Sequence, residues 1–281
     1  MFEERAQKAM SRLGFGSRRE IERWIEQGRV KVNGKAIALG ARVREGDQVQ
    51  CNGRRVFIRP PGNVVRVLAY NKPEGEVCSR KDDSGRRTVY KNLPGLPNGR
   101  WVGIGRLDIN TSGLLLFTNN GELANRLMHP SHEIEREYAV RVNGHVSAEK
   151  IQQLLDGVAL EDGPARFERI EDAGGQGSNH WYHVVLKEGR NREVRRLWEA
   201  VDTRVSRLIR LRYGNIVLPR SLRQGKSLEV EYEQVEQLCA QVGLICERPK
   251  PKRVYRGAKK TQKNPSSKSS WGKPPRRKSR R

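Results

Sequence analysis

The chain has 281 residues, enough for two folded domains and a tail, and its formal net charge of +24 far exceeds what solubility requires. The surplus lies at the two ends, because residues 1–62 carry +7, residues 63–247 carry +2 and residues 248–281 carry +15. This distribution predicts binding to a polyanion such as a nucleic acid, and the lack of any apolar run near 18 residues or of a signal-peptide segment after Met1 argues against a membrane partner and favours a cytoplasmic protein.

The N-terminal segment is predicted to contain two helices followed by two β-hairpins. Residues 3–13 have helical spacing, and Ser17-Arg18-Arg19-Glu20 is a capping box that begins a second helix, which ends at Gly28. Asn33-Gly34 and Asn52-Gly53 are strong two-residue turn signals between short apolar strands. The expected strands are 30–32, 35–37, 48–51 and 54–58.

This unit resembles the S4 RNA-binding domain over about residues 3–58. The residues that carry the resemblance are Gly16-Ser17-Arg18-Arg19, Ile25, Gly28-Arg29-Val30, Val32-Asn33-Gly34 and Gly46-Asp47. The resemblance implies that a basic helical face grips structured RNA, with phosphate contacts from Arg18, Arg19, Arg23 and Arg29. The alternative is a charged helix face that only contacts solvent.

Composition divides the chain into an S4-like domain (1–60), a linker (61–64), a central domain (65–245) and a tail (246–281). Pro60-Pro61-Gly62-Asn63 indicates the linker. From Arg248 onward the tail is rich in Lys, Arg, Pro, Ser and Gly and has no acidic residue, so we expect it to be disordered. Such a tail would raise non-specific RNA affinity in a salt-dependent way, with a localisation signal as the competing interpretation.

The central domain alternates strands and helices without an internal repeat. Its predicted strands are 64–70, 138–142 and 183–186, and its predicted helices are 122–128, 147–156 and 191–201. In the last helix, Val194, Leu197, Trp198 and Val201 form the buried side. The pattern therefore puts the helix's arginines on its polar surface.

The segment from Gly105 to Gly113 is the strongest candidate for a catalytic loop. A short strand is predicted before it, at Val102 and Ile104, and a buried strand follows at 114–117. The Gly-, Asn- and Ser-rich segment between them cannot continue either strand, so Asp108 is expected on a turn with rigid flanks. The alternative is that this aspartate only caps the turn with its own side chain.

Metal and cofactor sites are not predicted. The four cysteines form no C-x-x-C pair, and the pair His180 and His183 lies in a predicted strand, where residues three apart point to opposite faces. The chain has no dinucleotide or phosphate-binding glycine loop, and Ser112 is not in a G-x-S-x-G elbow. We therefore expect reduced structural thiols, no metal and no cofactor.

Four motifs, in order, resemble those of the bacterial rRNA pseudouridine synthases, specifically the large-subunit branch of the RsuA/RluB group. They are Lys72-Pro73-Glu74-Gly75, then Gly105-Arg106-Leu107-Asp108 with Thr111-Ser112-Gly113-Leu114, then Arg136-Glu137-Tyr138, then Leu186 with Gly189-Arg190-Asn191-Arg192-Glu193-Val194-Arg195-Arg196-Leu197. The resemblance covers about residues 3–245. It implies an α+β fold, in which the S4-like domain precedes a mixed, largely antiparallel β-sheet domain with the active site in its cleft.

The implied activity is the conversion of one uridine in large-subunit ribosomal RNA into pseudouridine, by a monomer and without a cofactor. The resemblance implies that Asp108 is the nucleophile or base, that the Tyr138 ring packs on the uracil, and that Arg195 is the ion-pair partner of Asp108. Leu186 would form part of the pocket wall and Arg106 would help to expel the nucleotide. Two rival functions are the same chemistry on small-subunit rRNA and a non-catalytic ribosome-assembly factor.

Four further basic residues are predicted near the site. Lys72 is assigned to the substrate pocket, with a solvated surface lysine as the alternative. Arg190, Arg192 and Arg196 are assigned to RNA phosphates, because they adjoin a glycine loop and a helix N-terminus; the alternative is a charged helix face.

Overall fold

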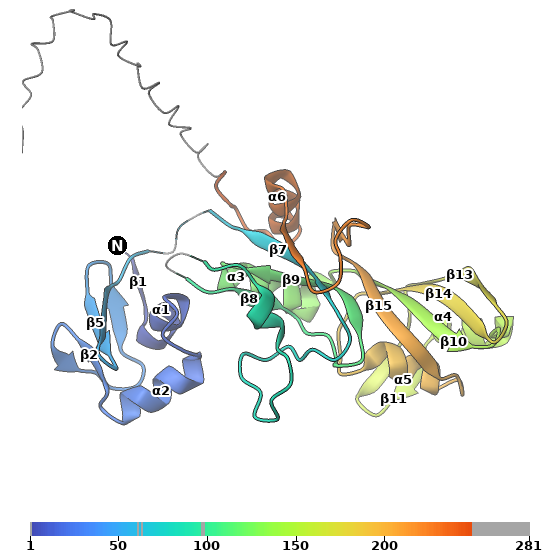
Figure 1. The fold of residues 1–281 in the computed structure, drawn as a ribbon, viewed down its shortest axis with the longest axis horizontal. Coiled ribbons are helices and arrows are strands. Elements are labelled where there is room, and N and C mark those ends of the chain that lie inside the picture. Colours follow the sequence, from blue (N-terminus) through green and yellow to red (C-terminus); the bar gives the residue numbers. More distant parts are fainter. Residues whose placement is uncertain (1, 61, 63, 97–98, 249–281) are drawn as a thin grey trace, which may run out of the picture. The chain divides into compact units, whose positions relative to one another are not determined.

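The computed structural model describes residues 2–60, 62, 64–96 and 99–248 (Figure 1). Most of the predicted basic tail, from residue 249 onward, and two of the four predicted linker residues lie outside this range. Among the described residues, no helix has both the length and the apolar character needed to cross a membrane.

The N-terminal unit follows its local sequence signals closely. The Glu20 backbone N–H donates to the Ser17 side chain at 3.2 Å and the Ser17 N–H donates to the Glu20 carboxylate at 3.3 Å, so the predicted capping box is formed. Asn33 and Gly34 have φ of 49° and 83°, as a type I′ hairpin turn requires. The elements are β1 (Glu3–Arg5), α1 (Ala6–Arg12), α2 (Arg18–Glu26), β2 (Val30–Val32), β3 (Lys35–Ala36), β4 (Arg42–Arg44), β5 (Gln48–Cys51) and β6 (Arg54–Phe57).

The prediction of a helix over the whole of residues 3–13 is wrong at its start. Residues Glu3–Arg5 form β1, which pairs antiparallel with β4, and α1 begins only at Ala6. Glu3 lies opposite Arg44 and makes ion pairs with Arg44 and Arg42. A pairing with residues about 40 positions away therefore overrides the local helical spacing.

The central domain is built on a nine-stranded sheet. The strand order is β13-β14-β10-β15-β9-β7-β17, with β16 on β15 and β8 on β9. Only the β9–β15 pairing is parallel among the described strands, which confirms the prediction of a mixed, largely antiparallel sheet. The strands are β7 (Val67–Lys72), β8 (Val102–Ile104), β9 (Ser112–Thr118), β10 (Arg136–Asn143), β13 (Arg169–Gln176), β14 (Asn179–Leu186), β15 (Val205–Tyr213), β16 (Ile216–Val217) and β17 (Ser227–Glu229), with β11 (Val158–Leu160) and β12 (Gly163–Ala165) in a separate pair.

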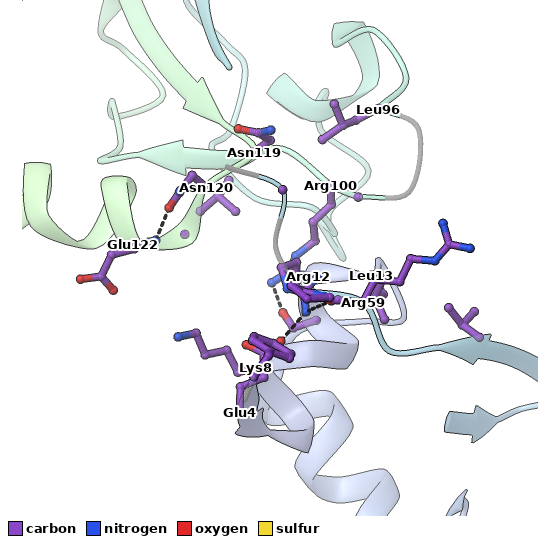
Figure 2. A pocket seen from close by; sticks show the side chains of 18 of the residues that line it. Glu4, Lys8, Arg12, Leu13, Arg59, Leu96, Arg100, Asn119, Asn120 and Glu122 are labelled. Carbon is purple, nitrogen blue, oxygen red and sulfur yellow. Dashed lines mark hydrogen bonds and ion pairs between the residues drawn. The ribbon is translucent and has the colours of Figure 1, made fainter. Parts of the chain in front are cut away.

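Helices pack on both faces of this sheet. All seven residues of β9 are buried, and they alternate between two apolar cores: Leu114 packs with Leu123 of α3, whereas Leu115 belongs to the core that contains Trp198 of α5. Asn120 caps α3 by accepting the Glu122 N–H (Figure 2). The helices are α3 (Gly121–Met128), α4 (Ala148–Asp156), α5 (Glu193–Glu199) and α6 (Tyr232–Ala240), with 3-10 turns at Val89–Asn92 and Pro130–His132.

Candidate active site

A cavity of about 640 Å³ lies where the loop before β9 meets one end of strands β10, β14 and β15. A volume in this range suits a small ligand or a single nucleotide. Among the residues that line it are six of the predicted site residues: Arg106, Asp108, Tyr138, Leu186, Arg190 and Arg192. The sequence motifs therefore meet in one pocket although they are up to 86 positions apart in the chain.

Asp108 lies on the turn between β8 and β9 as predicted. Its carboxylate is half-buried, lines the cavity and makes no hydrogen bond or ion pair with other described residues. The alternative that this side chain only caps its own turn is therefore not supported, because a backbone contact, from Thr111 N–H to Asp108 O at 3.1 Å, closes the turn. The carboxylate remains available to a ligand.

Hydrogen bonds to its backbone carbonyls hold the candidate catalytic loop, which we define as residues 108–111 and call the catalytic loop. The Lys72 ammonium donates to Asp108 O at 3.1 Å and to Thr111 O at 2.8 Å, and it lies 3.5 Å from Ile109 O. The Gly75 N–H donates to Ile109 O at 2.8 Å, and the Arg195 guanidinium donates to Asn110 O at 2.9 Å. Each carbonyl of the loop thus has a donor, which fixes the backbone from which the Asp108 side chain projects.

Lys72 is a positioning residue rather than part of the substrate pocket. Its side chain is fully buried, it does not line the cavity, and its ammonium also donates to Pro73 O at 3.0 Å. Burial lowers its pKa, while Cys78, Glu76 and Asp108 act in the opposite direction. The prediction of a substrate contact and the alternative of a solvated surface lysine are both wrong. The loop folds over the ammonium, and local sequence does not record this contact.

Arg195 also acts on the loop and does not form the expected ion pair with Asp108. Arg195 is 9% exposed, and its guanidinium donates to Val205 O at 3.0 Å and to Asn110 O at 2.9 Å. Burial and the charge of Arg192 lower its pKa, and the Asp108 charge opposes this shift. The two charges therefore interact across the loop without contact. The helical pattern was wrong in placing Arg195 on the polar surface, because β15 covers that side of α5.

Tyr138 and Leu186 form one wall of the cavity. Tyr138 pairs with Val184 across the β10–β14 ladder, and Leu186 lies two residues further along β14, so both side chains project from the same face of the sheet. Tyr138 is 8% exposed and Leu186 is 2% exposed. An aromatic ring beside an aliphatic wall suits a flat, partly apolar ligand such as a base.

The three arginines predicted to contact RNA phosphates differ in the structure. Arg190 donates to Glu188 at 2.8 Å and to Pro164 O at 2.7 Å, and Arg196 forms a bidentate pair with Asp162 at 2.8 and 2.9 Å. These two guanidinium groups hold the turn between β11 and β12, so most of their hydrogen bonds are made within the protein. Arg192 is more exposed and makes a 3.6 Å ion pair with Glu199.

The four arginines predicted for the S4-like unit are all exposed: Arg18, Arg19, Arg23 and Arg29. Arg29 donates to Asn52 at 2.7 Å and lies over the Trp24 ring. A second cavity, of about 810 Å³, is lined among others by Lys8, Arg12 and Arg100 (Figure 2). It contains none of the residues predicted for catalysis.

Glu193 is a pocket residue that should make stability depend on pH. The residue is 3% exposed, and burial together with the Glu188 carboxyl group raises the pKa of its side chain from 4.5 to about 7. The folded protein therefore keeps a proton that the unfolded chain releases, so the free energy of unfolding should fall as pH rises from about 4.5 to 7. Glu193→Gln should remove this loss and be more stable than the wild type at pH 8 by about 1–2 kcal/mol.

Urea unfolding at pH 5 and pH 8 measures this difference. Glu199→Gln, at an exposed position on the same helix, is the control that should keep the wild-type pH dependence. Identical pH dependence in Glu193→Gln and the wild type would contradict the prediction.

His180 and His183 contact different partners, as expected for residues three apart in a strand. His183 lies 3.9 Å from Glu137, whereas His180 bonds to Asp172 at 2.6 Å. His145, Asp172 and His180 have possible ligand atoms within 4.8 Å of one another, a grouping that the sequence analysis did not foresee. The Asp172 carboxylate already accepts the Gly174 N–H, which together with His180 lowers its pKa.

Several residues of the cavity were missed from the sequence. Cys78 lines the wall and its thiol exchanges hydrogen bonds with the backbone of Leu107. Tyr90 packs edge-on against Phe117, and Arg210 and Tyr213 come from β15. Apolar residues alternating with arginines over 209–213 would have indicated that strand.

Comparison with known proteins decides the family. The profile described as RNA pseudouridylate synthase matches residues 66–200, and the S4 domain profile matches residues 4–49. Over 247 residues the chain is 57% identical to the Yersinia pestis protein named ribosomal large subunit pseudouridine synthase B, covering 87% of this chain and 78% of that one. The chain belongs to the RNA pseudouridylate synthase family.

Other relatives agree with this assignment. The proteins of the same name from Escherichia coli K12 and Pseudomonas aeruginosa are 56% and 55% identical over 238 and 243 residues, or 84% and 86% of this chain. The match covers 82% of the Escherichia coli protein but only 63% of the Pseudomonas protein. The chain therefore spans less than two thirds of the length of the Pseudomonas protein. A crystal structure of a pseudouridylate synthase aligns with a TM-score of 0.58 at 25% identity, over 83% of this chain and 99% of that one.

Proposed function

We propose that this chain converts a specific uridine of large-subunit ribosomal RNA into pseudouridine, with Asp108 as its catalytic carboxylate. The observation that carries the proposal is an unpaired, half-buried carboxylate that lines a cavity beside Tyr138 and Leu186. The large-subunit substrate is inferred from the names of the relatives. A pure assembly factor would not need an unpaired carboxylate in a cavity, on a loop whose carbonyls all accept hydrogen bonds.

The reaction breaks the bond between ribose C1′ and uracil N1 and joins C1′ to C5 of the same base. No atom is gained or lost, so the proposal includes no cofactor and no metal. Asp108 either attacks C1′ or removes the 2′ proton, and both roles need the ionised carboxylate. Lys72 and Arg195 hold the loop from behind through the carbonyl oxygens of Asp108 and Asn110.

The target base must leave its helix to reach the cavity. Extrusion of a nucleotide costs roughly a few kcal/mol, which contacts to RNA phosphates can offset. Arg106 is exposed and lines the cavity, so it would take the place of the extruded base. Tyr138 and Leu186 would hold the detached uracil by stacking and apolar contact while it rotates.

We assign RNA binding to the exposed arginines of the S4-like unit and to Arg192. The basic tail would add non-specific affinity. The same proposal describes a monomer that works in the cytoplasm, without a membrane partner, on rRNA or on a ribosome-assembly intermediate.

Mapping pseudouridines in the ribosomal RNA of cells that lack this protein tests the proposal. We expect one large-subunit site to change from pseudouridine to uridine, and to be restored by the wild-type gene but not by an Asp108→Asn form. Loss of a small-subunit site instead would keep the chemistry and correct the substrate. An unchanged map would reject the enzyme and favour the assembly factor.

A further inference from the structure

We infer that Arg210 is a further catalytic residue, which donates hydrogen bonds to the uracil and balances the negative charge that the base carries while it is detached. This inference rests on the proposed isomerisation. Arg210 belongs to β15 and to no motif that suggested the activity, and it lines the same cavity as Asp108 and Tyr138.

Arg210 is buried without a counter-ion. Its side chain is 3% exposed, its Nε donates to Leu114 O at 2.7 Å, and one terminal nitrogen, Nη2, has no partner. No carboxylate pairs with it among the described residues. By contrast Arg212, on the same strand, bonds to Glu137 at 2.8 Å and to Glu135 at 2.9 Å.

An uncompensated buried charge is costly, by several kcal/mol even after the protein relaxes. The Tyr213 ring, whose centroid lies 5.2 Å from the Arg210 guanidinium carbon, offsets only part of this cost. A group of this kind is therefore matched to a ligand that brings acceptors or negative charge into the cavity.

A β-bulge directs Arg210 into the cavity. On β10, Glu137 pairs with Arg212 and the next residue, Tyr138, pairs with Arg210, so Leu211 has no partner in the β10–β15 ladder. Without this extra residue, Arg210 and Tyr213 would project from opposite faces, because they are three positions apart. The bulge gives them a shared face, and bulges commonly redirect side chains beside active sites.

On the other side of β15 from β10, strand β9 fixes the backbone at Arg210. Gly113, which lies in β9 two residues after the catalytic loop, pairs with Arg210 in the parallel β9–β15 ladder and has φ of +100°. A Cβ atom on Gly113 would lie 2.3 Å from Arg210 O, so only glycine allows this approach. Arg210 therefore sits between the partner of the uracil, Tyr138, and the loop that carries Asp108.

The electron count of the reaction explains why a cation is useful there. When the C1′–N1 bond breaks, its electron pair stays on N1 and spreads to the two carbonyl oxygens of the uracil. This holds whether Asp108 bonds to C1′ or removes the 2′ proton. The pair is then used again when C5 bonds to C1′, and the C5 proton is finally exchanged for a proton on N1. A guanidinium beside a carbonyl oxygen stabilises the detached anion and the transition states on both sides of it.

Single-turnover pseudouridine formation on transcribed large-subunit rRNA tests the inference. Arg210→Met should lower the rate by about 100-fold, as loss of one charge-assisted donor to a developing anion does. RNA affinity, measured by filter binding, should stay within about threefold, because no phosphate contact is lost. Arg210→Lys, which keeps the charge, should recover part of the rate. Arg204→Met, at an exposed arginine next to β15, is the control that should match the wild type.

A second substrate separates a chemical role from a structural one. Fluorine at C5 makes uracil a better leaving group, so transcripts with 5-fluorouridine need less stabilisation of the anion. The rate deficit of Arg210→Met in consuming the target 5-fluorouridine should be severalfold smaller than its deficit on uridine. If Arg210→Met is unfolded by thermal melting, Arg210→Gln, which retains an N–H toward Leu114, takes its place in both assays.

A wild-type rate in the charge-removing variant would overturn the inference, as would equal deficits on the two substrates or a parallel loss of RNA affinity. Inactivity of the wild-type protein on both ribosomal RNAs would instead reject the proposed function. The two failures are thus distinguishable.

Discussion

Asp108→Asn should abolish pseudouridine formation, lowering the single-turnover rate by at least about 10³-fold. Asparagine preserves the shape of the side chain and leaves the carbonyl contacts of residues 108–111 in place, but it can neither attack C1′ nor accept the 2′ proton. Binding of large-subunit rRNA should remain within about threefold of wild type, because the phosphate contacts lie elsewhere.

The measurement combines pseudouridine detection after a single turnover with filter binding on the same transcript. Asp83→Asn, at an exposed position outside the cavity, is the matched control and should have wild-type activity. Normal turnover by the Asp108→Asn protein would refute the mechanism, whatever the map of modified sites shows.

Lys72→Met should have the largest effect on stability, lowering the free energy of unfolding by about 3–5 kcal/mol. Methionine has a similar length but no donor, so the carbonyls of Pro73, Asp108 and Thr111 would lose their buried partner. Because the same carbonyls position the catalytic turn, the rate should also fall by about 100-fold in the protein that remains folded.

Urea unfolding and single-turnover assays at a temperature well below the unfolding transition measure the two effects. Lys91→Met, at an exposed position of the same domain, should change neither. A Lys72→Met protein within about 1 kcal/mol of wild type and fully active would show that the ammonium does not hold the loop.

Local signals in the sequence predicted much of the secondary structure. The capping box at Ser17 and Glu20 and the Asn-Gly turns are formed, since their residues are adjacent and their conformations are restricted. The turn at Asp108 was also expected, because glycine and asparagine interrupt two apolar strands. Predictions were less accurate where distant strands compete with local spacing, as at β1.

The side-chain roles of Lys72, Arg195 and Arg210 could not be read from local pattern. Each is a basic residue, and the sequence does not tell whether its charge meets solvent, an RNA phosphate or a backbone carbonyl. The first two turned inward to the catalytic loop, and the expected Asp108–Arg195 ion pair is not formed. Arg190 and Arg196, which the sequence analysis assigned to RNA phosphates, contact the turn at Asp162, and their binding to RNA stays a prediction.

By itself the sequence determined that this chain has a basic S4 unit, an aspartate on a rigid turn between two strands and no recognisable cofactor loop, because each of these depends on residue type and close spacing. Tertiary structure alone decided which cations reach the pocket. Their placement depends on strand register, and the one-residue bulge at Leu211 reverses the direction of every later side chain of β15. Register is set by pairing between segments far apart in the chain, which no local pattern records.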